Sequence, residues 1–289
     1  MIQSNYHIHT DFCDGKQSAA AMTKAAIQAG LTSIGFSSHA PLKYSNDWTM
    51  AGDDLPRYLQ TIESLKVRFK NQIKIYTGLE IDYYMDTQGI SERAQKTLPA
   101  LDYWIGSIHC MGALPDGEIA YFDDTPESMR AGLMALYNNN VAQMVGDYYQ
   151  GIAQMATDLK PDIVAHFDLI KKNNAHQIFF EEQTSWYRDC WHSALGAIAQ
   201  SGSILEINTG GIYRYGSSCL YPSVDILKEA HRLKIPITIS GDSHDLPMID
   251  YGFKTFLPDI LSQLQIKEMM ILKEGRWTVQ SIENIEKNI

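Results

Sequence analysis

The chain has 289 residues, of which 45% are hydrophobic and 20% are charged, and its formal net charge is -10. A chain of this length can bury a large hydrophobic core without disulfides. The excess of acidic residues argues against a duplex nucleic acid partner and against an anionic membrane surface, because both are bound through clustered Lys and Arg.

Seven short runs of β-branched and aromatic residues alternate with segments of helical spacing along the chain. Runs that are apolar on both faces are typical of parallel strands covered by helices. The expected strands are Ile2–His9, Ser33–His39, Ile73–Asp82, Tyr103–His109, Ile163–Phe167, Ile204–Asn208 and Ile235–Ser240.

The segments between these runs carry apolar residues at three- and four-residue steps. Ser18 is a suitable N-cap for a first helix over residues 19–29, and Gly30 is a suitable stop. The tail around Glu274-Gly275 predicts two short strands. The other expected helices are Leu55–Phe69, Val141–Leu159, Phe180–Gln200 and Ser223–Leu233.

Alternation of strand and helix over the whole chain indicates an α/β fold. Seven such units in a chain of this length fit a single distorted TIM-like (β/α)7 barrel over residues 1–289, with residues 266–289 as a hairpin-like appendage. A doubly wound open sheet remains an alternative, because periodicity alone cannot show that a barrel closes.

Six of the nine histidines fall at the carboxyl ends of expected strands, the edge that holds the active site in α/β barrels. His7 and His9 project to the same face of the first strand, about 6.6 Å apart, and Asp242 and His244 have the same spacing after the seventh. Imidazole and carboxylate together suit zinc, manganese or iron better than calcium or magnesium. The candidate ligands are His7, His9, Asp14, His39, Glu80, His109, His166, Asp242 and His244, which are too many for one tetrahedral ion and suit a cluster of two or three.

A single histidine at any one of these positions is more often a hydrogen-bonded core residue than a ligand, and an HxH pair alone is a weak motif. The repetition at six strand ends favours the metal interpretation. His176, His192 and His231 lie elsewhere, two of them in expected helices, and are expected to be structural or solvated.

Several of these motifs, in this order, resemble the PHP (polymerase and histidinol phosphatase) family. They are His7-Ile8-His9-Thr10, His39-Ala40-Pro41, Gly78-Leu79-Glu80, Ser107-Ile108-His109, Ala165-His166 and Gly241-Asp242-Ser243-His244, and the similarity runs from residue 2 to about residue 260. Within the family, the chain is similar to the stand-alone histidinol-phosphatases. This resemblance implies a distorted seven-stranded barrel, a cluster of zinc, iron or manganese ions, and hydrolysis of L-histidinol phosphate to L-histidinol and phosphate in histidine biosynthesis.

In such a reaction a hydroxide that bridges the metal ions attacks phosphorus, because the ions lower the pKa of bound water. Asp242, His244 and Glu80 are the expected catalytic residues. The loop ligand is expected to be Asp14, with Asp11 as the alternative. The proton donor for the leaving group stays open between Asp242 and a bound water.

The segment Asn208–Arg214 resembles the family segment in which a basic residue faces the substrate phosphate, so Arg214 is the candidate guanidinium on the phosphate oxygens. Lys43 is a second candidate. Glu118 and Tyr121 could recognise the ammonium group and the imidazole of histidinol, although an ordinary acidic surface loop explains that segment equally well.

Other activities remain open at this stage. The same chemistry could act on a nucleotide, a sugar phosphate, phosphotyrosine or a nucleic acid end, and a non-catalytic metal-binding PHP module is a further alternative. The chain lacks the Cys-x5-Arg run of thiolate phosphatases and the GxxxxGK[ST] phosphate loop.

The cellular location is expected to be cytoplasmic. No apolar run approaches the roughly 18 residues that span a bilayer, and the amino terminus has no signal-peptide pattern. The four cysteines are widely spaced, as in proteins of reducing compartments. The oligomeric state cannot be predicted.

Overall fold

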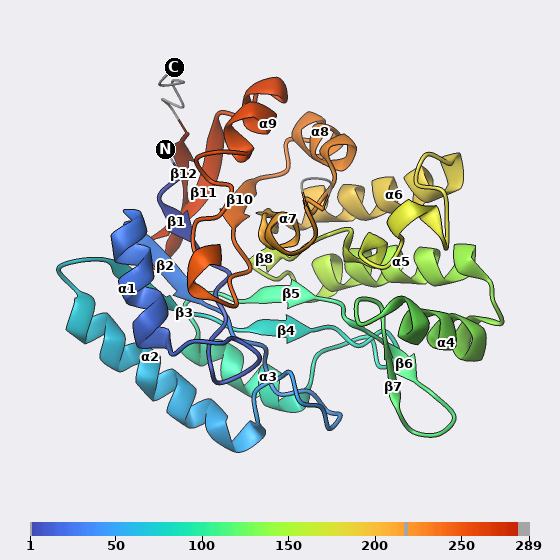
Figure 1. Ribbon diagram of the computed structural model, residues 1–289, viewed down its shortest axis with the longest axis horizontal. Helices are drawn as coiled ribbons and strands as arrows, with labels where there is room; N and C mark the ends of the chain where they lie inside the picture. Colours follow the sequence, from blue (N-terminus) through green and yellow to red (C-terminus); the bar gives the residue numbers. More distant parts are fainter. Residues whose placement is uncertain (1, 217–218, 283–289) are drawn as a thin grey trace.

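The computed structural model describes residues 2–216 and 219–282 and shows a mixed α/β fold with parallel sheets (Figure 1). One sheet has the strand order β1-β2-β3 and the other the order β10-β9-β8-β5-β4, and every pair in both is parallel. The strands are β1 Ser4–Asn5, β2 Ser33–Phe36, β3 Lys74–Thr77, β4 Glu80–Asp82, β5 Ile105–Ser107, β8 Ile163–Val164, β9 Ile204–Asn208 and β10 Ile237–Ser240.

Helices follow most of these strands. The Ser18 side chain caps the first helix, and Gly30 ends it with a φ of 83°, as the sequence predicts. No helix of the described residues is long and apolar enough to cross a bilayer. The helices are α1 Ala19–Ala29, α2 Leu55–Phe69, α3 Glu92–Thr97, α4 Pro126–Tyr137, α5 Val141–Asp158, α6 Ser185–Ser201, α7 Gly210–Tyr215, α8 Val224–Arg232 and α9 Leu257–Gln263.

The expected helix Phe180–Gln200 begins later than predicted, at Ser185. The Asn174 side chain accepts hydrogen bonds from the backbone N–H groups of Phe179 and Phe180, which holds this segment in a loop. The Phe180 ring also packs against Tyr187 in α6, with ring centroids 5.1 Å apart. The apolar residues before Ser185 therefore cover the helix without belonging to it.

The prediction of one strand over Ile73–Asp82 was wrong, because the run is divided at Gly78 between β3 of one sheet and β4 of the other. The Tyr103 ring packs so closely on Gly78 that a Cβ atom there would lie 2.5 Å from Cζ of Tyr103. The Tyr58 hydroxyl donates to the Gly78 carbonyl at 2.8 Å. A glycine within a strand pattern marks such a close approach.

Two isolated parallel bridges connect the sheets, one between Ile8 and Ser243 and one between His39 and Glu80. The described strands thus form two parallel sheets joined at single residues, and not the one continuous closed sheet that the barrel prediction implies. Three of the four bridged residues lie just beyond the ends of β1, β2 and β10, and the fourth, Glu80, begins β4. The bridges therefore bring these positions to one edge of the molecule.

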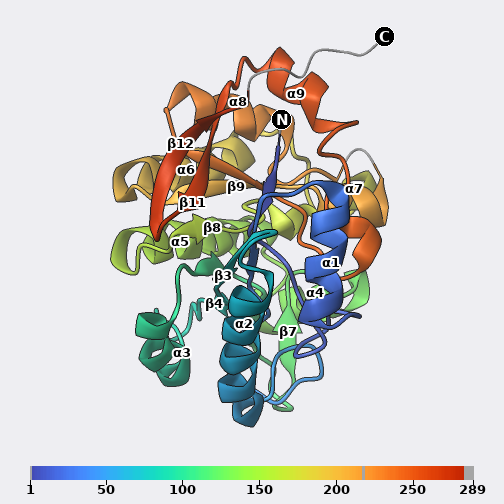
Figure 2. The same ribbon diagram turned by 90° about the vertical axis from the view of Figure 1, so that its left-hand side faces the viewer.

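Two antiparallel hairpins complete the fold. The hairpin β6 Cys110–Ala113 and β7 Ile119–Tyr121 was not predicted. The hairpin β11 Glu268–Lys273 and β12 Arg276–Ser281 turns at residues 274–275 and lies beside β10 (Figures 1 and 2). Residues 283–289 of the expected appendage lie outside the described residues.

The β11–β12 hairpin packs against a small apolar core near the amino-terminal ends of β5, β8 and β9, which we call the floor cluster. Trp277 of β12 packs on this core and donates from its indole N–H to Asp162 at 2.9 Å. The Tyr103 hydroxyl donates to the Tyr6 carbonyl at 2.6 Å. The floor cluster consists of Tyr6, Tyr103, Ile105, Ile163, Ala165, Ile204 and Leu272.

Candidate metal centre

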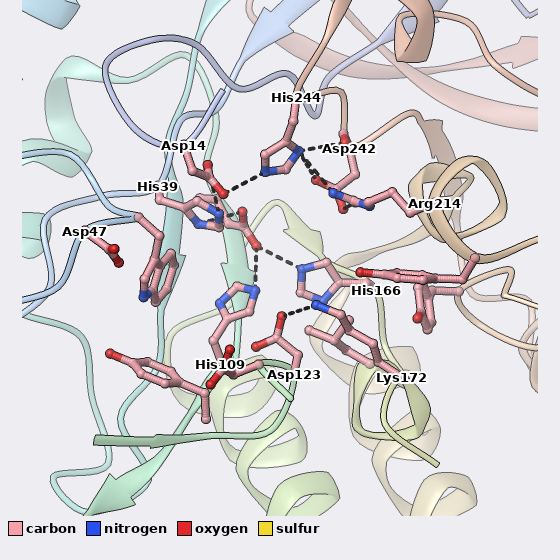
Figure 3. A pocket seen from close by; sticks show the side chains of 17 residues that line it. Asp14, His39, Asp47, His109, Asp123, His166, Lys172, Arg214, Asp242 and His244 are labelled. Carbon is pink, nitrogen blue, oxygen red and sulfur yellow. Dashed lines mark hydrogen bonds and ion pairs between the residues drawn. The ribbon is translucent and has the colours of Figure 1, made fainter. Parts of the chain in front are cut away.

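The nine candidate ligands lie together at the carboxyl ends of the strands, and we call them the histidine cluster. A cavity of about 450 Å³ opens above them (Figure 3). His7 and His9 are fully buried, and seven members of the cluster line the cavity. Those seven are Asp14, His39, Glu80, His109, His166, Asp242 and His244.

Glu80 is the centre of the histidine cluster and is only 1% exposed. Its Oε1 atom lies 2.9 Å from Nε2 of His166 and 3.6 Å from Nε2 of His109. Its Oε2 atom lies 3.0 Å from Nε2 of His7 and 3.0 Å from Nδ1 of His39. The two carboxylate oxygens therefore face two different groups of imidazoles.

Asp242 is the second carboxylate of the histidine cluster, and its backbone has a φ of +45°, in the left-handed region that non-glycine residues rarely adopt. Its Oδ1 atom lies 3.3 Å from Nε2 of His9, 3.3 Å from Nδ1 of His244 and 3.8 Å from Nε2 of His7. Its Oδ2 atom accepts a hydrogen bond of 2.6 Å from Arg214. Asp242 thus connects the buried histidines to the cavity.

Asp14 is the third carboxylate of the cluster, and the structure places Asp14, and not Asp11, among the grouped ligand atoms. It lies 3.2 Å from Nε2 of His244 and 3.8 Å from Nε2 of His39. Gly15 allows the loop to fold back, because a Cβ atom there would lie 2.5 Å from the backbone nitrogen of Thr10.

The side chains of the histidine cluster suit divalent cations. The Nε2 atom of His9 and the Nδ1 atom of His39 are buried and make no hydrogen bond with any described residue, although each has a carboxylate oxygen within 3.5 Å. Buried polar atoms without a hydrogen bond are costly, so they call for another partner. Three groups have ligand atoms within 4.8 Å of one another, namely His9–Asp14–His39–His244, His7–His9–Asp242 and His39–Glu80–His109.

Two pKa shifts in the cluster agree with this assignment, whereas neighbouring carboxylates outweigh burial and raise the pKa values of His7, His109 and His244. Burial lowers the pKa of His9 well below its usual range, and the neighbouring His244 adds to the effect. Burial alone would raise the pKa of Glu80, but His39 and His7 outweigh it and hold that pKa well below its usual range. A neutral imidazole beside an ionised carboxylate is the form that binds a metal ion.

Two buried carboxylates that the sequence did not predict contact the Nδ1 atoms of two of these histidines. Glu206 accepts from Nδ1 of His7 at 2.7 Å. Asp82 lies 3.1 Å from Nδ1 of His109 and accepts from the backbone N–H of the same residue at 2.9 Å. Glu206 lies inside the apolar strand β9, where an acid normally needs a partner, and this was its signal in the sequence. Asp82 is the last residue of β4 and had no such signal.

Two cationic side chains line the cavity. Arg214, from α7, was predicted, and Lys172 was not. Lys172 is held by Asp123 at 3.1 Å. Figure 3 shows Arg214 and Lys172 on the side of the cavity opposite Asp47. The side chains of Arg214 and Lys172 can neutralise an anion that enters above the histidine cluster.

Of the other three residues that the sequence predicts to contact the substrate, one lines the cavity and two do not. Tyr121 lines the cavity beside Trp48, with ring centroids 5.6 Å apart, and the Trp48 ring stands at 90° to that of His39. Lys43 does not line the cavity, because it is paired with Asp86 at 2.9 Å. Glu118 is exposed near the turn of the β6–β7 hairpin, away from the cavity lining.

The three remaining histidines lie outside the cluster, as the sequence predicts. His192 is paired with Glu229 at 2.8 Å on the surface, with its side chain 52% exposed. His176 and His231 are exposed.

Comparison with known proteins shows the family of the chain. The profile of the PHP domain matches residues 5–210. The chain is 28% identical over 280 residues to the histidinol-phosphatase of Bacillus subtilis (strain 168), which covers 89% of this chain and 99% of that protein. It is 27% identical over 217 residues to the histidinol-phosphatase of Lactococcus lactis subsp. lactis, covering 72% of each chain.

Two solved structures have the same fold. The crystal structure of a candidate histidinol phosphatase from Listeria monocytogenes has a TM-score of 0.76 at 24% identity and covers 88% of this chain and 99% of its own. That of the histidinol phosphate phosphatase from Lactococcus lactis, complexed with zinc, L-histidinol and phosphate, has a TM-score of 0.69 at 20% identity, covering 96% and 98%.

Proposed function

The chain belongs to the PHP domain family, and from this membership we propose that it is a metal-dependent phosphomonoesterase that hydrolyses L-histidinol phosphate to L-histidinol and phosphate in histidine biosynthesis. The observation that carries the proposal is the histidine cluster, in which three carboxylates lie among six imidazoles beneath a cavity with two cationic side chains. The names of the relatives with similar sequences support the choice of substrate.

Two or three divalent ions of zinc, manganese or iron would be held by the nine side chains of the histidine cluster. Glu80 is suited to serve two ions, since its two oxygens face different imidazoles. Bound ions would supply positive charge and a water of lowered pKa for attack on phosphorus.

The chain itself would hold the phosphate with Arg214 and Lys172. A guanidinium matches two phosphate oxygens at once, whereas an ammonium acts as a point charge. Arg214 is fixed in place by its hydrogen bond to Asp242, and Lys172 by its ion pair with Asp123. These two cations would orient the ester over the histidine cluster.

The acidic and aromatic side chains that line the cavity suit the alcohol part of the substrate. Asp47 and Asp124 line the cavity, and no ion pair involving either is found among the described residues. Together with the rings of Trp48 and Tyr121, they offer negative charge and aromatic surface. Histidinol carries an ammonium group and an imidazole, which match both features.

We further propose that the two sheets are the wall of a distorted (β/α)7 barrel and that residues 1–289 form one domain. The isolated bridges at Ile8–Ser243 and His39–Glu80 support this, since they lie at the two junctions between the sheets. A cytoplasmic location stays a prediction.

A substrate panel tests the proposed function. Protein loaded with manganese or zinc is incubated with L-histidinol phosphate, O-phosphotyrosine, a sugar phosphate and a nucleoside monophosphate, and the released phosphate is measured alongside the metal content. We expect histidinol phosphate to be hydrolysed with the highest kcat/KM. Efficient hydrolysis of another ester with none of histidinol phosphate would refute the substrate. Stoichiometric metal without any turnover would indicate a non-catalytic metal-binding module.

A further inference from the structure

Glu206, in the middle of β9, is a fully buried acid, with none of its surface exposed. Its Oε1 atom lies 2.7 Å from Nδ1 of His7. Its Oε2 atom accepts from the backbone N–H of His166 at 2.8 Å and from the side-chain amide of Asn208 at 3.0 Å. Three donors from three different segments therefore converge on one carboxylate.

An ionised carboxylate at a fully buried position must be stabilised by its neighbours. A carboxylate removed from water loses several kcal/mol of solvation, which only close partners can offset. Lys and Arg are absent from its hydrogen-bond partners, and His7 is the one titratable group among them. The charge of Glu206 therefore acts mainly on the ring of His7.

The geometry points to Glu206 as a positioning residue that holds His7 with a proton on Nδ1 and the Nε2 lone pair directed at a metal ion. The two ring nitrogens of histidine are coupled, because an N–H on Nδ1 leaves Nε2 of the neutral ring free to act as a ligand. Nε2 of His7 lies 3.0 Å from Glu80 and 3.8 Å from Asp242, the two carboxylates of the cluster nearest to it. Glu206 binds no ion itself. This inference rests on the metal-binding part of the proposed function.

Substitution of Glu206 by Gln separates this role from simple packing, because the two side chains have nearly the same shape. Gln has one acceptor where Glu has two. If its amide group faces His7, it donates to Nδ1 and moves the ring proton to Nε2, which then cannot bind a metal. If it faces His166, two N–H donors oppose each other and the bond to the backbone is lost. Either orientation disturbs a ligand of the cluster.

The experiment compares wild type, Glu206→Gln and the control Glu229→Gln. Glu229 forms a glutamate–histidine contact of similar length, 2.8 Å to His192, but on the surface and outside the histidine cluster. Metal-free protein is titrated with Zn²⁺ in competition with a chromophoric chelator, which gives the number of sites and their dissociation constants. The thermal midpoint of each metal-free protein is measured in parallel.

We expect Glu206→Gln to weaken at least one zinc site by about 10–100-fold, the range for outer partners of metal-binding histidines, and Glu229→Gln to leave all sites unchanged. Unchanged zinc affinities in a folded Glu206→Gln protein would overturn the inference. A wild-type protein that binds no zinc would instead refute the metal cluster, and with it the premise.

A second measurement does not depend on Glu206→Gln and covers the case in which that variant fails to fold. Long-range ¹H–¹⁵N spectra of zinc-loaded wild-type protein report which ring nitrogen of each histidine carries the proton, and loss of one signal set in His7→Gln assigns His7. A proton on Nδ1 of His7 supports the inference. A proton on Nε2 contradicts it.

Discussion

The two ends of the same strands have opposite chemistry. In β9, Ile204 belongs to the floor cluster, while Glu206, two residues later on the same face, supports His7 of the histidine cluster. Tyr103, two residues before β5, lies in the floor cluster, and His109, two residues after β5, lies in the histidine cluster. The carboxyl ends carry charged side chains whose burial lowers the stability of the fold. The amino ends carry aromatic and aliphatic side chains whose burial raises it. Activity and stability should therefore respond to different substitutions.

The largest effect on activity is expected at Asp242. Asp242→Ala removes a carboxylate from among His7, His9 and His244. We expect kcat/KM for histidinol phosphate to fall by at least about 10³-fold, the upper range for loss of one charge-stabilising group. The thermal midpoint of the metal-free protein should change by only a few degrees, roughly 1 kcal/mol. Steady-state kinetics and calorimetry check both.

The control for Asp242→Ala is Asp250→Ala, which removes a surface carboxylate paired with Lys254. Turnover by Asp242→Ala equal to that of the control would exclude Asp242 from the metal centre. If Asp242→Ala lowered the thermal midpoint strongly and left turnover normal, the carboxyl end of the strands would serve stability and not activity.

A smaller effect on activity is expected at Arg214, which lies at the rim of the histidine cluster. Arg214→Ala removes the charged donor that would face the phosphate, so KM should rise by about 10–100-fold, as expected for hydrogen bonds to a charged group. Inhibition by inorganic phosphate should weaken in parallel, and Arg214→Lys should be intermediate. Steady-state kinetics of these variants are compared with those of the control Arg57→Ala, which removes an exposed arginine paired with Asp54. If KM and phosphate inhibition both stay at wild-type values, Arg214 does not contact the phosphate.

The smallest effect on activity is expected at the floor. Trp277→Ala removes the half-buried indole that packs on the floor cluster and donates to Asp162. The free energy of unfolding should fall by about 3 kcal/mol, the lower end for removal of a large aromatic side chain. Turnover below the thermal midpoint should be unchanged. Trp277→Phe, which keeps most of the packing, should recover part of the loss in urea unfolding. Loss of turnover in a folded Trp277→Ala protein would mean that the floor cluster is needed for activity as well as for stability.

The sequence could predict the histidine cluster because its signal is local. Strand-end positions and two-residue spacing put His7, His9, Asp242 and His244 on one edge in any parallel α/β arrangement. The sequence favours Asp14 as the loop ligand and leaves Asp11 as the alternative. In the structure the loop folds back at Gly15, and Asp14 lies 3.2 Å from His244.

The remaining features depend on contacts between distant segments. The division of Ile73–Asp82 at Gly78 follows from the packing of Tyr103, which is 25 residues away in the chain. Lys172 and Trp48 lie in loops without a repeating pattern, so nothing local indicated that they line the cavity. The late start of α6 depends on the Asn174 side chain, which captures two backbone N–H groups that an apolar pattern cannot reveal.

The floor cluster also determines the dielectric environment of Glu206. Apolar side chains below this carboxylate and buried histidines above it keep water away, so its charge is screened much less than a charge at the surface. The contacts Glu206–His7 and Glu229–His192 have nearly the same length, 2.7 and 2.8 Å, yet only the first lies in a medium of low polarisability. A layer of isoleucine and tyrosine that touches no substrate thus sets how strongly one acid can influence the metal centre.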